Sequence, residues 1–216
     1  MTLRLVLALS LDGRLAPPDG GAAQIGGAGD REVLEQALAW ADAVLLGAGT
    51  LRAHGSSCQI RRPELLAARQ QRGVAPQPIT LVVSRSCAPP GLQPEWLFWR
   101  QPLQRWLVAP APVGQPAPSG FERLLPLQGW PELLAQLRAE GLHNLVLLGG
   151  AQLAGELLQV DVVDELQFTL CPLLLGGAHS WLPAQVRLQP QRWTLLEQRP
   201  LADGELLLRY GRSGNS

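Results

Sequence analysis

The chain has 216 residues, of which 46% are hydrophobic, and this length and composition suit one globular domain. Its 18 basic residues balance 18 acidic ones, so the sequence lacks the basic excess that is typical of nucleic-acid-binding proteins. Every basic residue is Arg, and the absence of Lys excludes chemistry that needs a Lys amine, such as a Schiff base or a P-loop. No apolar run reaches the roughly 18 residues of a transmembrane helix, so we expect no membrane partner.

The cysteines and histidines indicate a reducing compartment and no metal site. The sequence has three of each, widely spaced and without a CxxC pair. A disulfide framework or a zinc site would need closer and more regular spacings. We therefore expect a cytoplasmic protein without a metal. We interpret the apolar N-terminus, Met1 to Leu11, as a first strand rather than a signal peptide.

The order of the predicted elements indicates an α/β fold. Residues 3–9 form a nearly continuous apolar run, typical of a strand covered on both faces, and Asp30 is predicted to cap a helix that ends near Trp40. Further strands are predicted at residues 43–46, 79–83, 105–109, 144–148 and 165–170, and further helices at 63–72, 130–140 and 151–158. Two last strands, about 191–198 and 205–210, predict a closing antiparallel hairpin around Pro200 and Asp203-Gly204.

The whole chain, residues 1–216, is therefore predicted to be a single domain with a mixed, mostly parallel sheet and flanking helices. A parallel sheet binds ligands at the carboxyl ends of its strands. The loops that follow the strands are therefore the candidate functional segments.

The Gly149-Gly150 pair lies where a strand runs into a helix. A turn without side chains exposes backbone N–H groups at the positive end of the helix dipole, and a pyrophosphate suits that arrangement. On the pair alone, a tight turn that only packs helix on strand is the favoured interpretation. The complete G-x-G-x-x-G pattern is absent, which argues against an ordinary Rossmann domain.

Two other strand ends carry polar residues. Thr50 follows the second strand and is predicted either to bind a phosphate or ribose, or only to cap a helix. Ser84-Arg85 follows the third strand, and a hydroxyl beside a guanidinium suits a phosphate monoester such as the 2′-phosphate of NADPH. A merely polar strand end is the alternative for this pair.

Arginine and aspartate residues in two further loops are candidate substrate contacts. Arg61 suits a bidentate clamp on a substrate phosphate, and a solvated surface residue is the alternative. Asp12 with Arg14 suits polar groups of a substrate, although Asp12-Gly13 is also ordinary turn chemistry. His54 is the one histidine near the predicted site, and a lone histidine is more often structural or on the surface than an acid or base.

Seen together and in this order, the segments resemble the reductase domain of bacterial riboflavin biosynthesis, the C-terminal RibD domain. The segments that carry the resemblance are residues 9–16, 42–50, 77–83, 149–158, 162–166, Cys171-Pro172 and 174–177. The resemblance implies a dihydrofolate reductase-like fold, a homodimer and an NADPH-dependent reductase. The family's reaction converts the ribosyl group of 5-amino-6-(5-phosphoribosylamino)uracil to a ribityl chain. The deaminase domain that often precedes this reductase is missing, so we expect a standalone reductase.

The resemblance also implies which residues hold each ligand. The expected cofactor-binding residues are Ala8, Thr50, His54, Ser84, Arg85, Gly149, Gly150, Ala151, Gln152, Leu153 and Ala154. The expected substrate-binding residues are Asp12, Arg14, Gln24, Cys58, Arg61 and Leu148. His54 is the candidate proton donor.

Several positions depart from the family's pattern. Leu148 stands where the family has Glu, His54 where it has Asp, and Gln24 where it has Trp. Ala22 and Leu38 replace a Ser and an Arg. The cofactor half of the pattern therefore survives better than the substrate half. Three interpretations remain: a divergent enzyme of the same pathway, a reductase of another pyrimidine or pteridine, and a cofactor-binding protein without turnover. Trp96, Trp99 and Trp106 are interpreted as marks of an oligomer interface.

Overall fold

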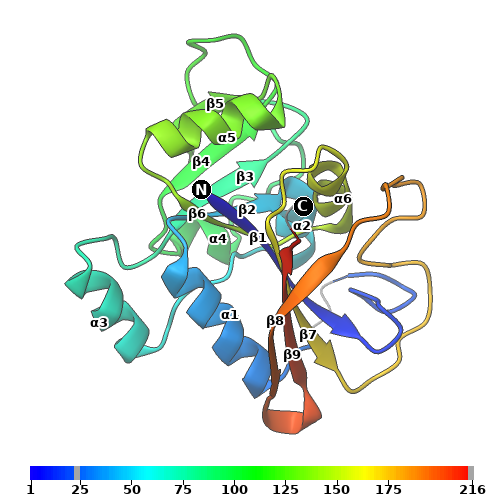
Figure 1. Cartoon of the computed structure of the whole chain (residues 1–216). Helices are drawn as coiled ribbons and strands as arrows, with labels where there is room; N and C mark the ends of the chain where they lie inside the picture. The colour runs from blue at the N-terminus through cyan, green and yellow to red at the C-terminus, as the bar shows by residue number, and fades with distance from the viewer. Residues whose placement is uncertain (22–24, 214–216) are drawn as a thin grey trace. The chain divides into compact units, whose positions relative to one another are not determined.

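Apolar runs in the sequence become the strands of two units, shown as a computed structural model in Figure 1. The structure describes residues 1–21 and 25–213. The first unit contains Met1 and Glu35–Val146, and the second contains Thr2–Leu34 and Leu147–Ser216. The extent of a single domain over the whole chain stays a prediction. In the part of the chain that the structure describes, no helix combines the length and apolar character needed to cross a membrane.

The first unit is built on strands in the order β5-β4-β3-β2-β6. Their bounds are β2 (Ala43–Gly47), β3 (Ile79–Val83), β4 (Arg105–Ala109), β5 (Arg123–Pro126) and β6 (Asn144–Leu147). The pairs β2–β3, β3–β4 and β4–β5 are parallel. Every residue of β4 is buried, Arg105 included, as is typical of a strand covered on both faces. Helices of this unit are α2 (Ala48–His54), α3 (Pro63–Gln71), α4 (Leu97–Arg100) and α5 (Trp130–Ala139).

Buried Arg69 on α3 completes the end of α1 (Ala28–Trp40), whose residues from Glu35 onward belong to the first unit. Its guanidinium donates hydrogen bonds to the carbonyl oxygens of Leu38, Ala39 and Ala41 at 3.3, 3.1 and 2.6 Å. Leu38 and Ala39 lie in the last turn of the helix and Ala41 follows it, so no helical N–H four residues on fills the acceptor sites of these carbonyls. Burial lowers the pKa of Arg69, and the three acceptors offset the cost of removing its charge from water.

The second unit contains strands in the order β1-β7-β9-β8. Their bounds are β1 (Thr2–Ser10), β7 (Glu165–Cys171), β8 (Trp193–Pro200) and β9 (Leu206–Arg212). β1 and β7 are parallel, whereas β9 is antiparallel to both β7 and β8. The short 3-10 helix η1 (Ala202–Gly204) joins β8 to β9, and α6 (Ala151–Gln159) completes the unit. The predicted closing hairpin is therefore confirmed and is orange to red in Figure 1.

The prediction that Asp30 caps α1 is wrong. The helix begins at Ala28, so Asp30 lies inside the first turn. Glu205 supplies the missing acceptors, because its carboxylate accepts hydrogen bonds from the N–H groups of Gly27 and Asp30 at 2.6 and 2.7 Å. This acceptor comes from the far end of the chain, so the local sequence does not predict it.

Two of the tryptophans expected at an oligomer interface, Trp99 and Trp106, pack against other residues of the first unit. Trp106 is 5% exposed. Trp99 meets Phe98 and Phe121 edge-on, with ring centroids 4.9 and 5.6 Å apart. These aromatic residues stabilise the packing of the unit. Trp96 and Trp99 are half-buried, and a role of this cluster in an oligomer interface stays a prediction.

Candidate functional site

The turn between β6 and α6 belongs to the second unit and has no side chains at its centre. Gly149 has φ +87°, a conformation that favours glycine, and a Cβ there would lie 3.3 Å from Leu7 Cδ2. The Gly149-Gly150 peptide bond is cis. Gly150 is the N-cap of α6, and no side chain caps the helix.

The N-terminus of α6 therefore offers bare backbone donors. The first main-chain hydrogen bond of the helix runs from Ala154 N–H to Gly150 O at 3.0 Å. Among the described residues, no acceptor meets the N–H groups of Ala151, Gln152 and Leu153. Donors of this kind, at the positive end of a nine-residue helix, suit an anionic ligand.

The loop after β1 also belongs to the second unit, and its polar groups are largely used within the protein. The Asp12 carboxylate accepts hydrogen bonds from Ser10 Oγ at 2.6 Å, Leu175 N–H at 3.1 Å and Gly176 N–H at 2.8 Å. These bonds, that from Ser10 first, hold the pKa of Asp12 well below its usual value. Arg14 Nε lies 3.6 Å from Asp12 Oδ2. The contacts join the loops after β1 and β7, and a substrate role for this pair stays a prediction.

Thr50 and His54 lie on α2 in the first unit. Thr50 is the third residue of the helix, and the N-cap is Gly47, so the interpretation of Thr50 as a cap is wrong. His54 ends the helix, and its side chain is exposed. Neighbouring protein atoms nevertheless exclude part of the water around its imidazole, which lowers the pKa of His54 below 6.5. The ring is therefore mainly neutral at pH 7, which weighs against His54 as a cationic proton donor.

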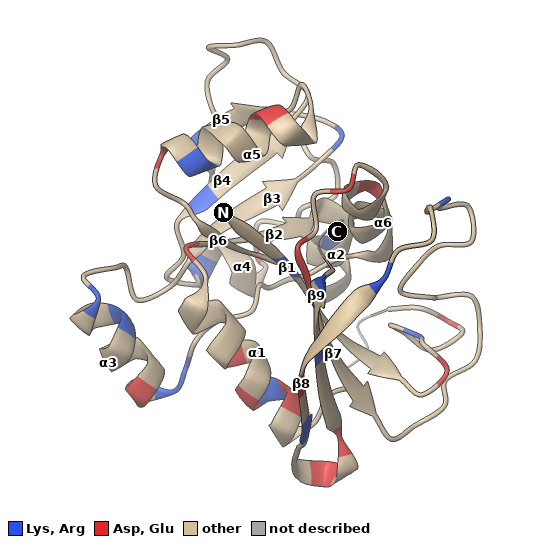
Figure 2. Ribbon diagram, in the orientation of Figure 1, with Lys and Arg blue, Asp and Glu red and all other residues tan. Residues whose placement is uncertain are grey.

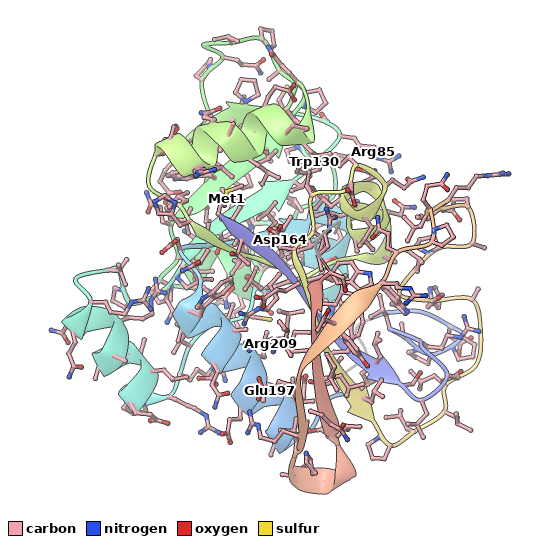
Figure 3. All side chains as sticks on the ribbon, in the orientation of Figure 1. Met1, Arg85, Trp130, Asp164, Glu197 and Arg209 are labelled. Atoms are coloured by element: carbon pink, nitrogen blue, oxygen red, sulfur yellow. The ribbon has the colours of Figure 1, made fainter. Side chains whose placement is uncertain are left out.

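The Ser84-Arg85 pair follows β3 directly. Ser84 is buried, its N–H donates to Val108 O at 2.9 Å, and its Oγ accepts the N–H of Ser86 at 3.1 Å. The Arg85 side chain, labelled in Figure 3, is exposed, and in residues 1–21 and 25–213 no acceptor or carboxylate engages its guanidinium. β2 pairs with β3 so that Gly47 is opposite Val83. Thr50 and Ser84 therefore follow neighbouring strand ends, as the sequence predicts for this unit.

Arg61 lies in the connection that enters α3, a stretch where Figure 2 shows blue ribbon. Its main chain is held by buried Glu35, whose Oε2 accepts the N–H groups of Arg61 and Arg62 at 2.7 and 2.9 Å. The Arg61 guanidinium is exposed, and within the described part of the chain it has no ion-pair or hydrogen-bond partner. Arg61 is therefore available to an external anion.

Two glutamine side chains hold the same connection further upstream. Gln101 Oε1 accepts Ser57 N–H at 2.8 Å and its Nε2 donates to Ser57 O at 2.7 Å. Gln77 makes the same pair of bonds with Ile60, at 2.9 and 2.8 Å. Sequence reasoning missed Glu35, Gln77 and Gln101, and the only available signal was that Gln77 falls in one of the segments that carry the family resemblance.

A half-buried acidic group, Asp30, lies in the second unit and was also missed. Burial raises the pKa of Asp30, and nearby Glu205 raises it further, while a hydrogen bond with Thr169 lowers it. Burial and the same two carboxylates raise the pKa of the Cys171 thiol to about 12. Cys171 therefore stays protonated and is chemically inert at neutral pH.

The expected site residues divide between the two units. The first unit holds Thr50, His54, Cys58, Arg61, Ser84 and Arg85. The second unit holds Ala8, Asp12, Arg14, Leu148, Gly149, Gly150, Ala151, Gln152, Leu153 and Ala154. Gln24 lies outside the described residues. Ala8, Leu148 and Cys58 are half-buried. Over residues 1–21 and 25–213, no group of three or more His, Cys, Asp or Glu side chains is placed to hold a metal ion.

Comparison with known proteins identifies the family. The sequence matches the model of the RibD C-terminal domain over residues 1–207, and the chain belongs to this family. It is 29% identical to a 2,5-diamino-6-ribosylamino-4(3H)-pyrimidinone 5′-phosphate reductase from Archaeoglobus fulgidus, over 81% of each chain. It is 28% identical to the riboflavin biosynthesis protein RibD of Escherichia coli, over 81% of this chain and 49% of that protein. The chain thus spans about half the length of its RibD relatives.

Solved structures confirm the predicted fold. RibD from Acinetobacter baumannii superposes with a TM-score of 0.77 at 28% identity, over 98% of this chain and 58% of that one. A dihydrofolate reductase from Enterococcus faecalis superposes with a TM-score of 0.55 at 14% identity, over 99% and 97% of the two chains. The fold is therefore dihydrofolate reductase-like.

Proposed function

We propose that the chain is an NADPH-dependent reductase of riboflavin biosynthesis that reduces the ribosyl group of 5-amino-6-(5-phosphoribosylamino)uracil to a ribityl chain. The observation that carries this proposal is the bare N-terminus of α6 behind Gly149 in a member of the RibD C-terminal domain family. A helix whose first N–H groups are unpaired and have no side-chain cap suits the pyrophosphate of a dinucleotide.

Each unit, taken by itself, offers groups of the kind that bind phosphate. In the second unit, the N–H groups of Ala151, Gln152 and Leu153 would hold the pyrophosphate. In the first unit, Arg85 has a free guanidinium and Ser84 offers a hydroxyl, a combination that suits the 2′-phosphate of NADPH. Thr50, from the neighbouring strand end, would add a hydroxyl contact.

Bound NADPH supplies the hydride for such a reduction. The protein has to hold the ribosyl carbon C1′, keep water away and let one proton reach the adjacent nitrogen or oxygen. These tasks need positioning more than a strong acid or base, so the replacement of a family carboxylate by Leu148 is compatible with turnover. His54 remains the candidate proton donor, although its lowered pKa leaves only a minority of the imidazole protonated at neutral pH.

Arg61 is proposed to bind the 5′-phosphate of the substrate. Its guanidinium has no partner in the described residues, and its main chain is fixed by Glu35. Guanidinium binds phosphate through paired, charge-assisted hydrogen bonds. Asp12, Arg14, Gln24 and Cys58 are proposed as further substrate contacts.

A second substrate has support from the relatives. The Archaeoglobus protein, which this chain covers over 81% of its length, is named as a reductase of the diaminopyrimidinone rather than the uracil compound. The two substrates differ at the pyrimidine ring and share the ribosyl phosphate. A reductase of the diaminopyrimidinone is therefore the alternative function.

The test is to follow the loss of NADPH absorbance with each of the two pyrimidine phosphates. We expect faster oxidation with the uracil compound, and a faster rate with the diaminopyrimidinone would establish the alternative. NADPH binding without reduction of either compound would indicate a cofactor-binding protein without turnover. Rescue of a riboflavin auxotroph that lacks the reductase tests in cells whether the protein turns over a substrate of this pathway.

Homodimerisation and a cytoplasmic location are proposed on the family resemblance alone. Light scattering coupled to gel filtration tests the first, and a mass of one 23.3 kDa chain would contradict it. Fractionation of the native host tests the second.

A further inference from the structure

The connection between α2 and α3 depends on side chains for the hydrogen bonds of much of its main chain. Within the described residues, the main chains of Ser57, Ile60 and Arg61 take part in no backbone–backbone hydrogen bond. The connection carries Arg61 and Cys58, which the proposed function assigns to the substrate. A segment without main-chain bonds is ordinarily free to change its path.

Side chains from three separate elements replace the missing main-chain bonds. Gln101, at the end of α4, pairs with both the N–H and the C=O of Ser57. Gln77, just before β3, pairs with both groups of Ile60 in the same way. Glu35, on α1, accepts the N–H groups of Arg61 and Arg62. Each glutamine thus makes the two bonds that a neighbouring strand would make.

Two of these side chains are buried polar groups. Gln101 and Glu35 are each 5% exposed. A buried amide or carboxylate is costly unless it is hydrogen-bonded, so these contacts bind the connection firmly to the first unit. Glu35 Oε2 binds the main chain of Arg61, and within the described residues the Arg61 guanidinium is exposed and has no carboxylate partner.

We propose that Gln101, Gln77 and Glu35 are positioning residues that fix residues 57–62 and thereby present Arg61 to the phosphate monoester of the substrate. The inference rests on the proposed function and goes beyond it, because it assigns to three residues a part in substrate affinity without contact with the substrate. A fixed main chain lowers the ordering cost of phosphate binding and selects for phosphorylated substrates.

The test compares the phosphorylated substrate with its dephosphorylated nucleoside. Gln101→Glu and Gln77→Glu keep the size of the side chain and its acceptor but replace the donor with an oxygen that repels the carbonyl of Ser57 or Ile60. We expect each to raise KM for the phosphorylated substrate about tenfold. We expect kcat to stay within about twofold, and KM for the nucleoside to be unchanged. Exposed Gln70→Glu, on α3, is the matched control.

A double-variant cycle separates positioning from a general effect on folding. If Gln101 acts through Arg61, adding Gln101→Glu to Arg61→Ala produces no further rise in KM. Equal losses for both substrates, or independent losses in the double variant, would overturn the inference. Thermal unfolding shows whether Gln101→Glu folds. If it does not, Gln77→Glu, at a more exposed side chain, is used for the same comparison of the two substrates.

A binding experiment keeps this inference separate from the proposed function. Failure of the wild type to reduce either pyrimidine phosphate would refute the function. Calorimetric titration with ribose 5-phosphate would still test the positioning. We expect binding to the wild type, loss with Arg61→Ala and weakening of about tenfold with Gln101→Glu. Absence of binding to the wild type, or unchanged binding to Gln101→Glu, would refute the positioning.

Discussion

The two units offer anion-binding groups of different kinds. The first unit offers the exposed guanidiniums of Arg61 and Arg85, on loops after parallel strands or short helices. The second unit offers backbone N–H groups at the start of α6, behind two glycines. Side-chain donors carry full charge and can be removed one at a time. Backbone donors are removed only by altering the path of the chain.

This difference decides which substitutions are informative. In the first unit an Arg→Ala change tests a ligand contact directly. In the second unit only a change at a glycine reaches the donors, and it also affects stability. Substitutions in both units therefore test the contrast between side-chain and backbone donors. Arg61→Ala is expected to have the largest effect and Asp30→Asn the smallest.

Arg61→Ala is expected to have the largest effect. A charge-assisted hydrogen bond contributes about 1.5–3 kcal/mol, so KM for the phosphorylated substrate should rise roughly tenfold to a hundredfold. Steady-state kinetics with the phosphorylated and dephosphorylated substrates measure this. Arg62→Ala is the neighbouring control, since Arg62 already lies 3.6 Å from Glu64. An unchanged KM for Arg61→Ala would remove this residue from the substrate site.

Arg85→Ala is expected to reduce the preference for NADPH over NADH by about tenfold, because it removes the charged partner of the 2′-phosphate. Dissociation constants for the two cofactors, measured by calorimetry, give the ratio. The loss should fade as salt concentration rises, since the contact is exposed and screened. If the variant keeps the wild-type preference for NADPH, Arg85 does not bind the 2′-phosphate.

Gly149→Ala tests the backbone donors of the second unit. A residue with a Cβ at φ +87° costs about 1–2 kcal/mol, and the crowding by Leu7 adds to that. We expect a Tm lower by roughly 2–8 °C and weaker NADPH binding. Gly141→Ala is the matched control, because Gly141 has φ +88° and a Cβ there would meet nothing within 4 Å. It should lower the Tm and leave NADPH affinity unchanged.

Asp30→Asn is expected to have a small, pH-dependent effect. Because burial raises the pKa of Asp30 above 3.8 in the folded chain, the ionised carboxylate destabilises the fold at neutral pH. Asn should therefore raise the Tm at pH 7, and the gain should shrink as pH falls through the raised pKa and vanish near 3.8. Thermal unfolding across this range, with exposed Asp19→Asn as the control, measures it. A gain that grows as pH falls would contradict the account.

Most strands and the longer helices were predicted from the sequence, whereas two short helices and one short strand were not. The predicted strands 79–83 and 105–109 coincide with β3 and β4, since a short run of mostly apolar residues between polar flanks indicates a buried strand. The structure adds α2, α4 and β5, which have seven residues or fewer. Such short segments carry little periodic signal and depend on tertiary packing.

The candidate site follows the same division. Gly149, Ser84 and Arg85 were predicted because glycine and charged residues at strand ends are visible in the sequence. Glu35 and Gln101 were missed, because they act through hydrogen bonds to residues 26 and 44 positions away. A side chain that satisfies a distant backbone group leaves no pattern in a single sequence.

Titration of the wild-type protein with NADPH and NADH tests the central claim most directly. The account predicts saturable binding of NADPH, tighter than that of NADH, because the free Arg85 guanidinium and the bare start of α6 both suit phosphate groups. The absence of measurable NADPH binding by the folded protein would contradict it.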